Sequence, residues 1–130
     1  MPVVKQLSVF LENKPGALAR LYDSFARAKV NLIAISVSDT VDHAVVRMVV
    51  DAPERAIALI EHHGVLVVDN DVLAVRLTNK PGALANMAEK LAQAKINIEY
   101  AYGTAGASKT GSTIILRVNN LAKARKVLKA

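Results

Sequence analysis

The heptapeptide Asn-Lys-Pro-Gly-Ala-Leu-Ala occurs twice in this chain, at residues 13–19 and 79–85. When the chain is aligned with itself at an offset of 66 residues, 14 of the 25 positions from Leu7 to Asn31 are identical to those from Leu73 to Asn97. A self-match of this quality at half the length of a 130-residue chain indicates that one small module has been duplicated. Any fold proposed for the chain must therefore contain two copies of the same small module.

The pattern of apolar residues changes at the repeated word. Before it, Leu7, Val9 and Leu11 alternate with polar residues, which predicts a strand with one buried face. After Pro15 and Gly16 the apolar residues recur every three or four positions, which predicts an amphipathic helix. The second copy shows the same change of period, so each module begins with a strand that leads into a helix.

The rest of the first copy predicts two more strands, a second helix and a last strand, at residues 32–38, 44–50, 53–63 and 65–68. A turn at Asp69-Asn70-Asp71 is expected to join the copies. The second copy follows the same order, with a longer hairpin loop and without the last strand. We therefore predict an α+β fold of two tandem ferredoxin-like βαββαβ modules, residues 1–69 and 70–130, each an antiparallel sheet with its helices on one face.

The repeated word places several chemical features at one strand-to-helix junction. Unpaired backbone N–H groups, the positive end of a helix dipole and an Asn side chain would all lie together. Gly16 and Gly82 have no Cβ, so a ligand can approach the backbone. A small carboxylate fits such a junction. The alternative is that Asn-x-Pro-Gly is only a well-formed helix start that was copied with its module.

The duplicated word resembles the first loop of the ACT domain, a family of small amino-acid-binding regulatory modules. The phrases AKVNL and AKINI after the helices, at residues 28–32 and 94–98, and the βαββαβ order strengthen the resemblance. It implies that effector amino acids bind between the first loop of one domain and the second-strand start of its neighbour. The ligand-binding residues implied by position are Asn13, Pro15, Gly16, Ala17, Asn31, Asn79, Pro81, Gly82, Ala83 and Asn97.

The resemblance also implies a regulatory protein rather than an enzyme, with a biosynthetic enzyme as a further partner. Some serine-binding members of the family have a His two residues before the loop Asn, where this chain has Leu11 and Leu77. The missing last strand should leave the strand at residues 72–78 as an exposed edge, so we predict a homodimer that covers it.

Composition removes several other classes of function. The absence of cysteine excludes disulfides, thiolate nucleophiles and cysteine-ligated zinc, and the three histidines have no metal-chelating spacing. No apolar run of membrane-spanning length and no secretory signal is found, so a cytoplasmic protein is expected. We expect neither a metal nor another cofactor, and no catalytic constellation emerges.

The sequence also suggests a phosphate-binding loop, which we set aside, and an RNA-binding module, which remains an alternative interpretation. The segment GTAGASKT, residues 103–110, approaches a phosphate-binding loop but leads into a predicted strand instead of a helix. RNA recognition modules share the strand order, and the net charge of +6 lies entirely in the second half of the chain. The third strands carry no base-stacking aromatic, although Tyr100 and Tyr102 lie two apart on a second strand. An RNA-binding adaptor and a purely structural interaction module are the rival interpretations.

Overall fold

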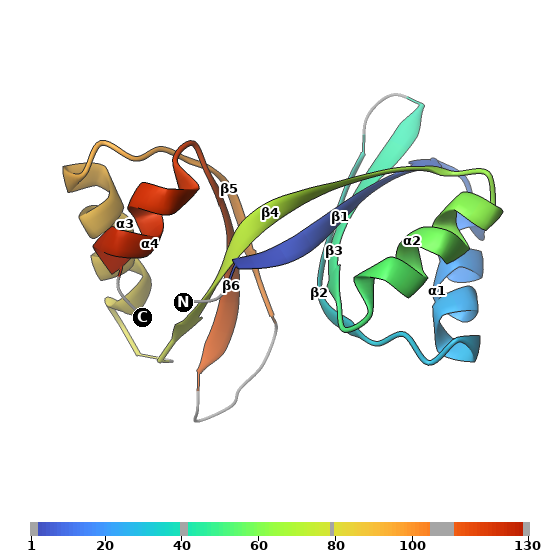
Figure 1. The fold of residues 1–130 in the computed structure, drawn as a ribbon, viewed down its shortest axis with the longest axis horizontal. Coiled ribbons are helices and arrows are strands. Elements are labelled where there is room, and N and C mark those ends of the chain that lie inside the picture. Colours follow the sequence, from blue (N-terminus) through green and yellow to red (C-terminus); the bar gives the residue numbers. More distant parts are fainter. Residues whose placement is uncertain (1–2, 40–41, 79, 105–110, 129–130) are drawn as a thin grey trace. The chain divides into compact units, whose positions relative to one another are not determined.

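The computed structural model describes residues 3–39, 42–78, 80–104 and 111–128 (Figure 1). The chain divides into two compact units, Lys5–Asn70 and Asp71–Ala130, the second of which also includes Met1–Val4. Each unit has its own hydrophobic core. The strand β4 continues from the first unit into the second.

The first unit contains three strands, two helices and the first part of a fourth strand. They are β1 (Val3–Glu12), α1 (Ala17–Arg27), β2 (Leu32–Asp39), β3 (His43–Val50), α2 (Pro53–His62) and β4 (Leu66–Leu77). The strand order is β2-β3-β1-β4, and β3 pairs antiparallel with both β1 and β2. Both helices lie on the same face of the sheet (Figure 1), where Leu7, Val9, Phe25, Met48 and Ile60 form the fully buried centre of the core.

The second unit repeats this arrangement with the rest of β4, α3 (Ala83–Gln93), β5 (Ile98–Gly103), β6 (Ser112–Val118) and α4 (Leu121–Leu128). Its strand order is β4-β6-β5, with antiparallel pairing throughout. Leu73, Leu91, Leu116 and Ala124 are completely buried between the strands and the two helices. The predicted α+β architecture of tandem ferredoxin-like modules is confirmed.

The beginning of the chain contributes to the second unit. No strand follows α4 within the described residues, as the sequence predicted. Val3, the first described residue of β1, packs against the core of the second unit instead. Val72 and Leu73 at this edge are completely buried. The expectation that the edge at residues 72–78 would be left exposed is therefore wrong, since the N-terminal segment covers part of it.

The turn predicted at Asp69-Asn70-Asp71 is also wrong, because all three residues lie inside the 12-residue strand β4. The side chains of Asp69 and Asn70 have partners on β1. The carboxylate of Asp69 lies 3.4 Å from Nζ of Lys5, and the side-chain oxygen of Asn70 accepts a hydrogen bond of 3.2 Å from Nε2 of Gln6. Gln6 is completely buried, so this bond compensates for the desolvation of its amide.

Both first helices end in the same backbone motif. Lys29 and Lys95 have positive φ angles of 59° and 61°, in the left-handed region. The next residue donates its N–H back into the helix, Val30 to the carbonyl of Phe25 and Ile96 to that of Leu91, each at 2.9 Å. This is a Schellman ending, in which a lysine takes the position that glycine usually occupies. The turn that leaves each helix is therefore made at the lysine and not at the following asparagine.

The two asparagines after these endings are held by the ends of β3 and β6. The backbone N–H of Asn31 donates to Oδ1 of Asp51 at 2.9 Å, and that of Asn97 donates to Oδ1 of Asn119 at 3.0 Å. Asp51 therefore does not cap α2, whose N-terminus has no side-chain cap. The same clamp in both units fixes where the second strand begins.

Candidate functional site

The two repeated loops have nearly the same backbone conformation. Gly16 and Gly82 are the residues before α1 and α3, with φ angles of 87° and 88°. No side chain caps either helix. The first helical N–H is already used within the loop, because Ala17 donates to the carbonyl of Lys14 and Ala83 to that of Lys80, both at 3.3 Å. The second and third N–H groups of each helix decide whether an anion can bind.

Those N–H groups belong to Leu18 and Ala19 in the first unit and to Leu84 and Ala85 in the second. None of them has a hydrogen-bond partner in the described part of the chain. They also lie at the positive end of a helix dipole. They are therefore available to water or to an incoming carboxylate, which is the arrangement that the repeated word predicted from its glycines.

Two cavities flank the first loop. The smaller, of about 110 Å³, is lined by Asn13, Ala17 and Leu18 on the loop side and by Val37 and Ala44 on the strand side. The larger, of about 190 Å³, lies on the other side of the loop. Ala17 lines both cavities.

Asn13 and Asn31 of the same unit lie at opposite ends of β3. The N–H of Asn13 donates to the carbonyl of Asp42, just before β3, whereas the carbonyl of Asn31 accepts from the N–H of Asp51, just after it. The eight residues of β3 span roughly 25 Å. One unit therefore cannot bring its own loop and its own Asn31 to a single small ligand.

In the second unit, Pro81, Gly82 and Ala83 are in the described loop, whereas Asn79 lies outside the described residues. A Cβ built on Gly82 would meet nothing within 4 Å, so the approach to this loop is open. Asn97 is clamped to Asn119 as Asn31 is to Asp51. The ligand roles assigned to all these residues stay predictions.

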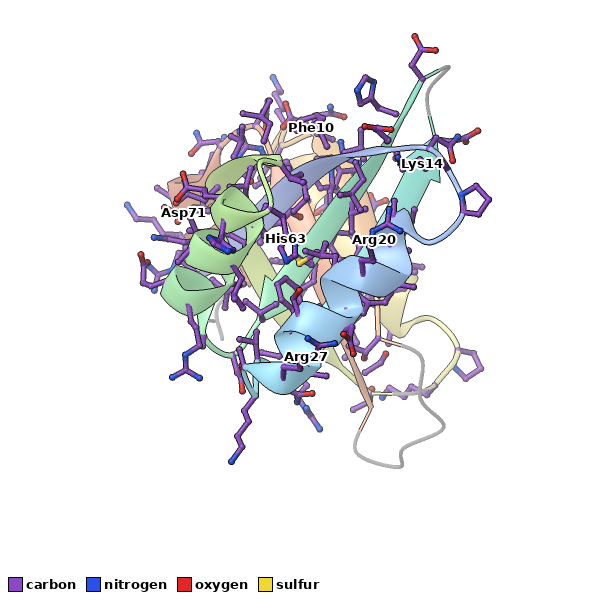
Figure 2. The ribbon with its side chains drawn as sticks, turned by 90° about the vertical axis from the view of Figure 1, so that its right-hand side faces the viewer. Phe10, Lys14, Arg20, Arg27, His63 and Asp71 are labelled. Atoms are coloured by element: carbon purple, nitrogen blue, oxygen red, sulfur yellow. The ribbon has the colours of Figure 1, made fainter. Side chains whose placement is uncertain are left out.

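The larger cavity contains polar residues that the sequence did not single out. Lys14, Arg20 and His63 line it, above a floor that includes Leu11 and Leu21. Figure 2 shows Arg20 on α1 near both Lys14 and His63. Arg20 immediately follows the repeated word, and Asn86 takes its place in the second copy. The two words are identical, but the residues directly after them differ, and this difference is the sequence signal that could have identified Arg20.

The other candidate residues remain without a role in chemistry. No group of three or more His, Asp or Glu side chains that could hold a metal exists within the described ranges. Residues 105–110 of the segment that approaches a phosphate-binding loop lie outside the described residues, and the next described element is the strand β6 and not a helix. The rings of Tyr100 and Tyr102 stack on each other with centroids 6.5 Å apart.

The first unit contains a contact between a serine and a histidine, but its geometry does not support catalysis. Ser24 Oγ lies 2.7 Å from Nε2 of His63, but it donates its own hydrogen to the carbonyl of Arg20 at 3.2 Å. The hydroxyl is then an acceptor toward the ring and is not activated as a nucleophile. No helix in the part of the chain that the structure describes has the length and apolar character needed to cross a membrane.

Two helix-covered units, each with a glycine loop at a strand-to-helix junction, define a class of tandem ferredoxin-like modules. The chain belongs to the ACT domain pair family, whose model matches residues 2–130. This agrees with the resemblance drawn from the repeated word and the helix-exit phrases. A comparison with curated proteins finds no match.

Solved structures show the same fold. The protein BT0572 from Bacteroides thetaiotaomicron is 33% identical, with a TM-score of 0.91, over 98% of this chain and 87% of that one. The regulatory subunit of aspartate kinase from Thermus thermophilus is 14% identical, with a TM-score of 0.69, over 98% of this chain and 93% of that one. The corresponding subunit from Thermus flavus is 16% identical, with a TM-score of 0.60 and coverages of 98% and 92%.

Proposed function

We propose that the protein is a regulatory sensor that binds one or two free amino acids through its duplicated glycine loops. The observation that carries this proposal is the pair of open helix starts in a chain of the ACT domain pair family. In each unit, two consecutive backbone N–H groups that have no partner among the described residues lie beside a glycine, which lets a carboxylate approach the backbone.

An amino acid also carries an ammonium group, which needs an oxygen acceptor. The backbone groups of Asn31 and Asn97 are held by Asp51 and Asn119, while their exposed side-chain amides have no partner among the described residues. Each amide oxygen is therefore an available acceptor. Because Asn13 and Asn31 lie at opposite ends of one unit, a complete site requires the loop of one module and the asparagine of another, at an interface between domains or subunits.

A ligand that binds between two modules stabilises the arrangement in which both contact it. Regulation follows if a partner interacts differently with that arrangement, since a ligand shifts an equilibrium only by its differential affinity for the two states. Two of the similar structures are described as regulatory subunits of aspartate kinase. We infer that the partner of this chain is an enzyme of amino-acid metabolism, controlled allosterically in the cytoplasm.

A homodimer is the assembly that we propose for the sensor. In the first unit β2 is an edge strand, and its side chains Ile33 and Val37 are 47% and 50% exposed. An edge strand with exposed apolar residues favours pairing with another chain. Light scattering should give twice the monomer mass of 13.9 kDa, and a monomeric mass at micromolar concentration would contradict the proposal.

Isothermal titration against the twenty amino acids tests the sensing function. Saturable heat from one or a few of them, lost when Gly16 and Gly82 are both replaced by alanine, supports the sensor. The Gly64→Ala variant is the matched control, since Gly64 also has a positive φ, of 72°, but lies after α2 and not before a helix. Silence from all twenty favours the structural module. Affinity for RNA that falls steeply with salt would favour the adaptor.

A further inference from the structure

The larger cavity of the first unit has the size and lining of a small-ligand site. Its volume of about 190 Å³ corresponds to roughly six water molecules, or to a small organic acid. Leu11 and Leu21, which are 6% and 3% exposed, form part of an apolar floor, and Val65 completes it. Polar side chains form the rest of the wall. This combination of apolar walls and a few polar groups is typical of sites that orient a small molecule.

The charge at this cavity is predominantly positive. Lys14 lies 3.1 Å from the carboxylate of Glu12, so these two lining residues neutralise each other. Arg20 forms no ion pair with any residue that the structure describes. Its Nη1 is 3.0 Å from the point that a Cβ on Gly16 would occupy, which places the guanidinium over the glycine loop. An arginine without an acidic partner at a cavity favours a carboxylate ligand, which it can bind with two parallel hydrogen bonds.

His63 is held at the opposite side of this cavity by a specific contact. It caps the C-terminus of α2, and its Nε2 lies 2.7 Å from Oγ of Ser24 on α1. Because Ser24 also donates to the carbonyl of Arg20, the ring is tied to the same turn of α1 that carries the guanidinium. The ring is therefore held against the backbone of α1 from which the Arg20 side chain projects.

The second unit lacks this combination. Asn86 occupies the position of Arg20, and no side-chain atom lies within 4 Å of a Cβ built on Gly82. The loops themselves are alike in sequence and in backbone conformation. The difference therefore concerns the side chains of the first unit and not the duplicated loop.

We propose that the first unit binds a small carboxylate in this cavity, through the guanidinium of Arg20, while His63 lines the wall of the cavity. The site depends on side chains and not on the open loop amides, so it does not rest on the amino-acid sensing proposed above. The carboxylate belongs either to a free organic acid or to an acidic amino acid. Both share the chemistry that Arg20 recognises, and the experiment separates them.

The test uses the full chain and two probes, succinate and L-aspartate, titrated calorimetrically at constant ionic strength. Arg20→Gln should weaken binding by about tenfold or more, because a charged hydrogen-bonding group is lost. Arg27→Gln is the matched control, since it makes the same charge change on the same helix, where Arg27 instead pairs with Asp23.

Binding of succinate that depends on Arg20 identifies an organic-acid site, and binding of L-aspartate alone identifies an amino-acid site; either supports the proposal. No saturable binding of either probe to the wild type, or equal weakening by Arg20→Gln and Arg27→Gln, would overturn it. Should Arg20→Gln fail to fold, amide shifts of Ala17 and Val65 in the wild type give the same decision. Amino acids that bind at the loop amides without these effects would leave the sensing function intact.

Discussion

Replacing the loop glycines by alanine perturbs the two modules in a matched way. Gly16 and Gly82 have φ angles of 87° and 88°, where an L-residue is strained by roughly 1–2 kcal/mol. A Cβ at Gly82 would meet nothing within 4 Å, so Gly82→Ala should cost only this backbone term. A Cβ at Gly16 would lie 3.0 Å from the end of the flexible Arg20 side chain, which can move aside. We therefore expect nearly equal losses of stability from the two substitutions.

Urea unfolding of both single variants and the double variant measures these losses. The free energies of unfolding should fall by about 1–2 kcal/mol for each single variant, and the losses should add because the glycines belong to units with separate cores. Gly64→Ala, with φ of 72° and open space around its Cβ, should lose a similar amount. A loss below about 0.3 kcal/mol for Gly82→Ala would show that the positive φ angle at this position does not strain an alanine.

Three further substitutions give separate tests. The hydrogen bond from Lys5 to Glu54, together with Asp69, raises the pKa of Lys5 above its ordinary 10.5, so its stabilisation is complete below that pH and is lost as the pH rises through the raised pKa. The gap in unfolding free energy between wild type and Lys5→Met should accordingly be constant from neutral pH up to the ordinary lysine pKa and shrink in strong base. Asp51→Ala should cost about 1 kcal/mol in urea unfolding, because its bond to the backbone N–H of residue 31 is lost. Gly111→Ala should cost at least about 3 kcal/mol and lower the melting temperature clearly, since its Cβ would overlap the carbonyl group of residue 77. A free-energy gap for Lys5→Met that stays the same across the pH range would contradict the ion pair of Lys5. Melting at the wild-type temperature would contradict the contact of residue 51 or of residue 111 in the corresponding variant.

The architecture could be predicted because its signals are local and duplicated. The change from a period of two to a helical period at Pro15 and Gly16 fixes where each first strand ends and each first helix begins. A second copy of the same pattern gave the prediction independent support. Asn120 directly precedes α4, and its Oδ1 accepts the N–H of Lys123 at 3.1 Å, which is a local signal for a helix start.

The features that could not be predicted depend on partners that are distant in the sequence. Asp69 and Asn70 resemble turn residues until Lys5 and Gln6, on a strand 64 residues earlier, are seen to bond with them. Asp51 has the composition of a helix cap, but an N–H 20 residues earlier takes its carboxylate. Local propensity describes what a residue does without tertiary partners, so it fails where such a partner exists.

The cavity in the first unit was missed for a related reason. The polar residues of this cavity come from separate elements: Lys14 from the first loop, Arg20 from α1 and His63 from the end of α2. No regular sequence spacing links these three positions. A comparison of the two copies does show that Arg20 is replaced by Asn86, but the sequence cannot show that the guanidinium lies over Gly16. A difference between duplicated modules identifies a candidate position in the sequence, and the structure then shows which contacts the side chain at that position makes.

The sensor proposal requires that the open amides of the two glycine loops bind the carboxylate of a free amino acid. Nuclear magnetic resonance of the ¹⁵N-labelled chain, titrated with each of the twenty amino acids, tests this binding at the amides themselves. We expect one or a few amino acids to produce saturable shifts that are largest at the amides of Leu18, Ala19, Leu84 or Ala85. If no amino acid moves these four amides at millimolar concentration, the loops are only well-formed helix starts and the sensor proposal is wrong.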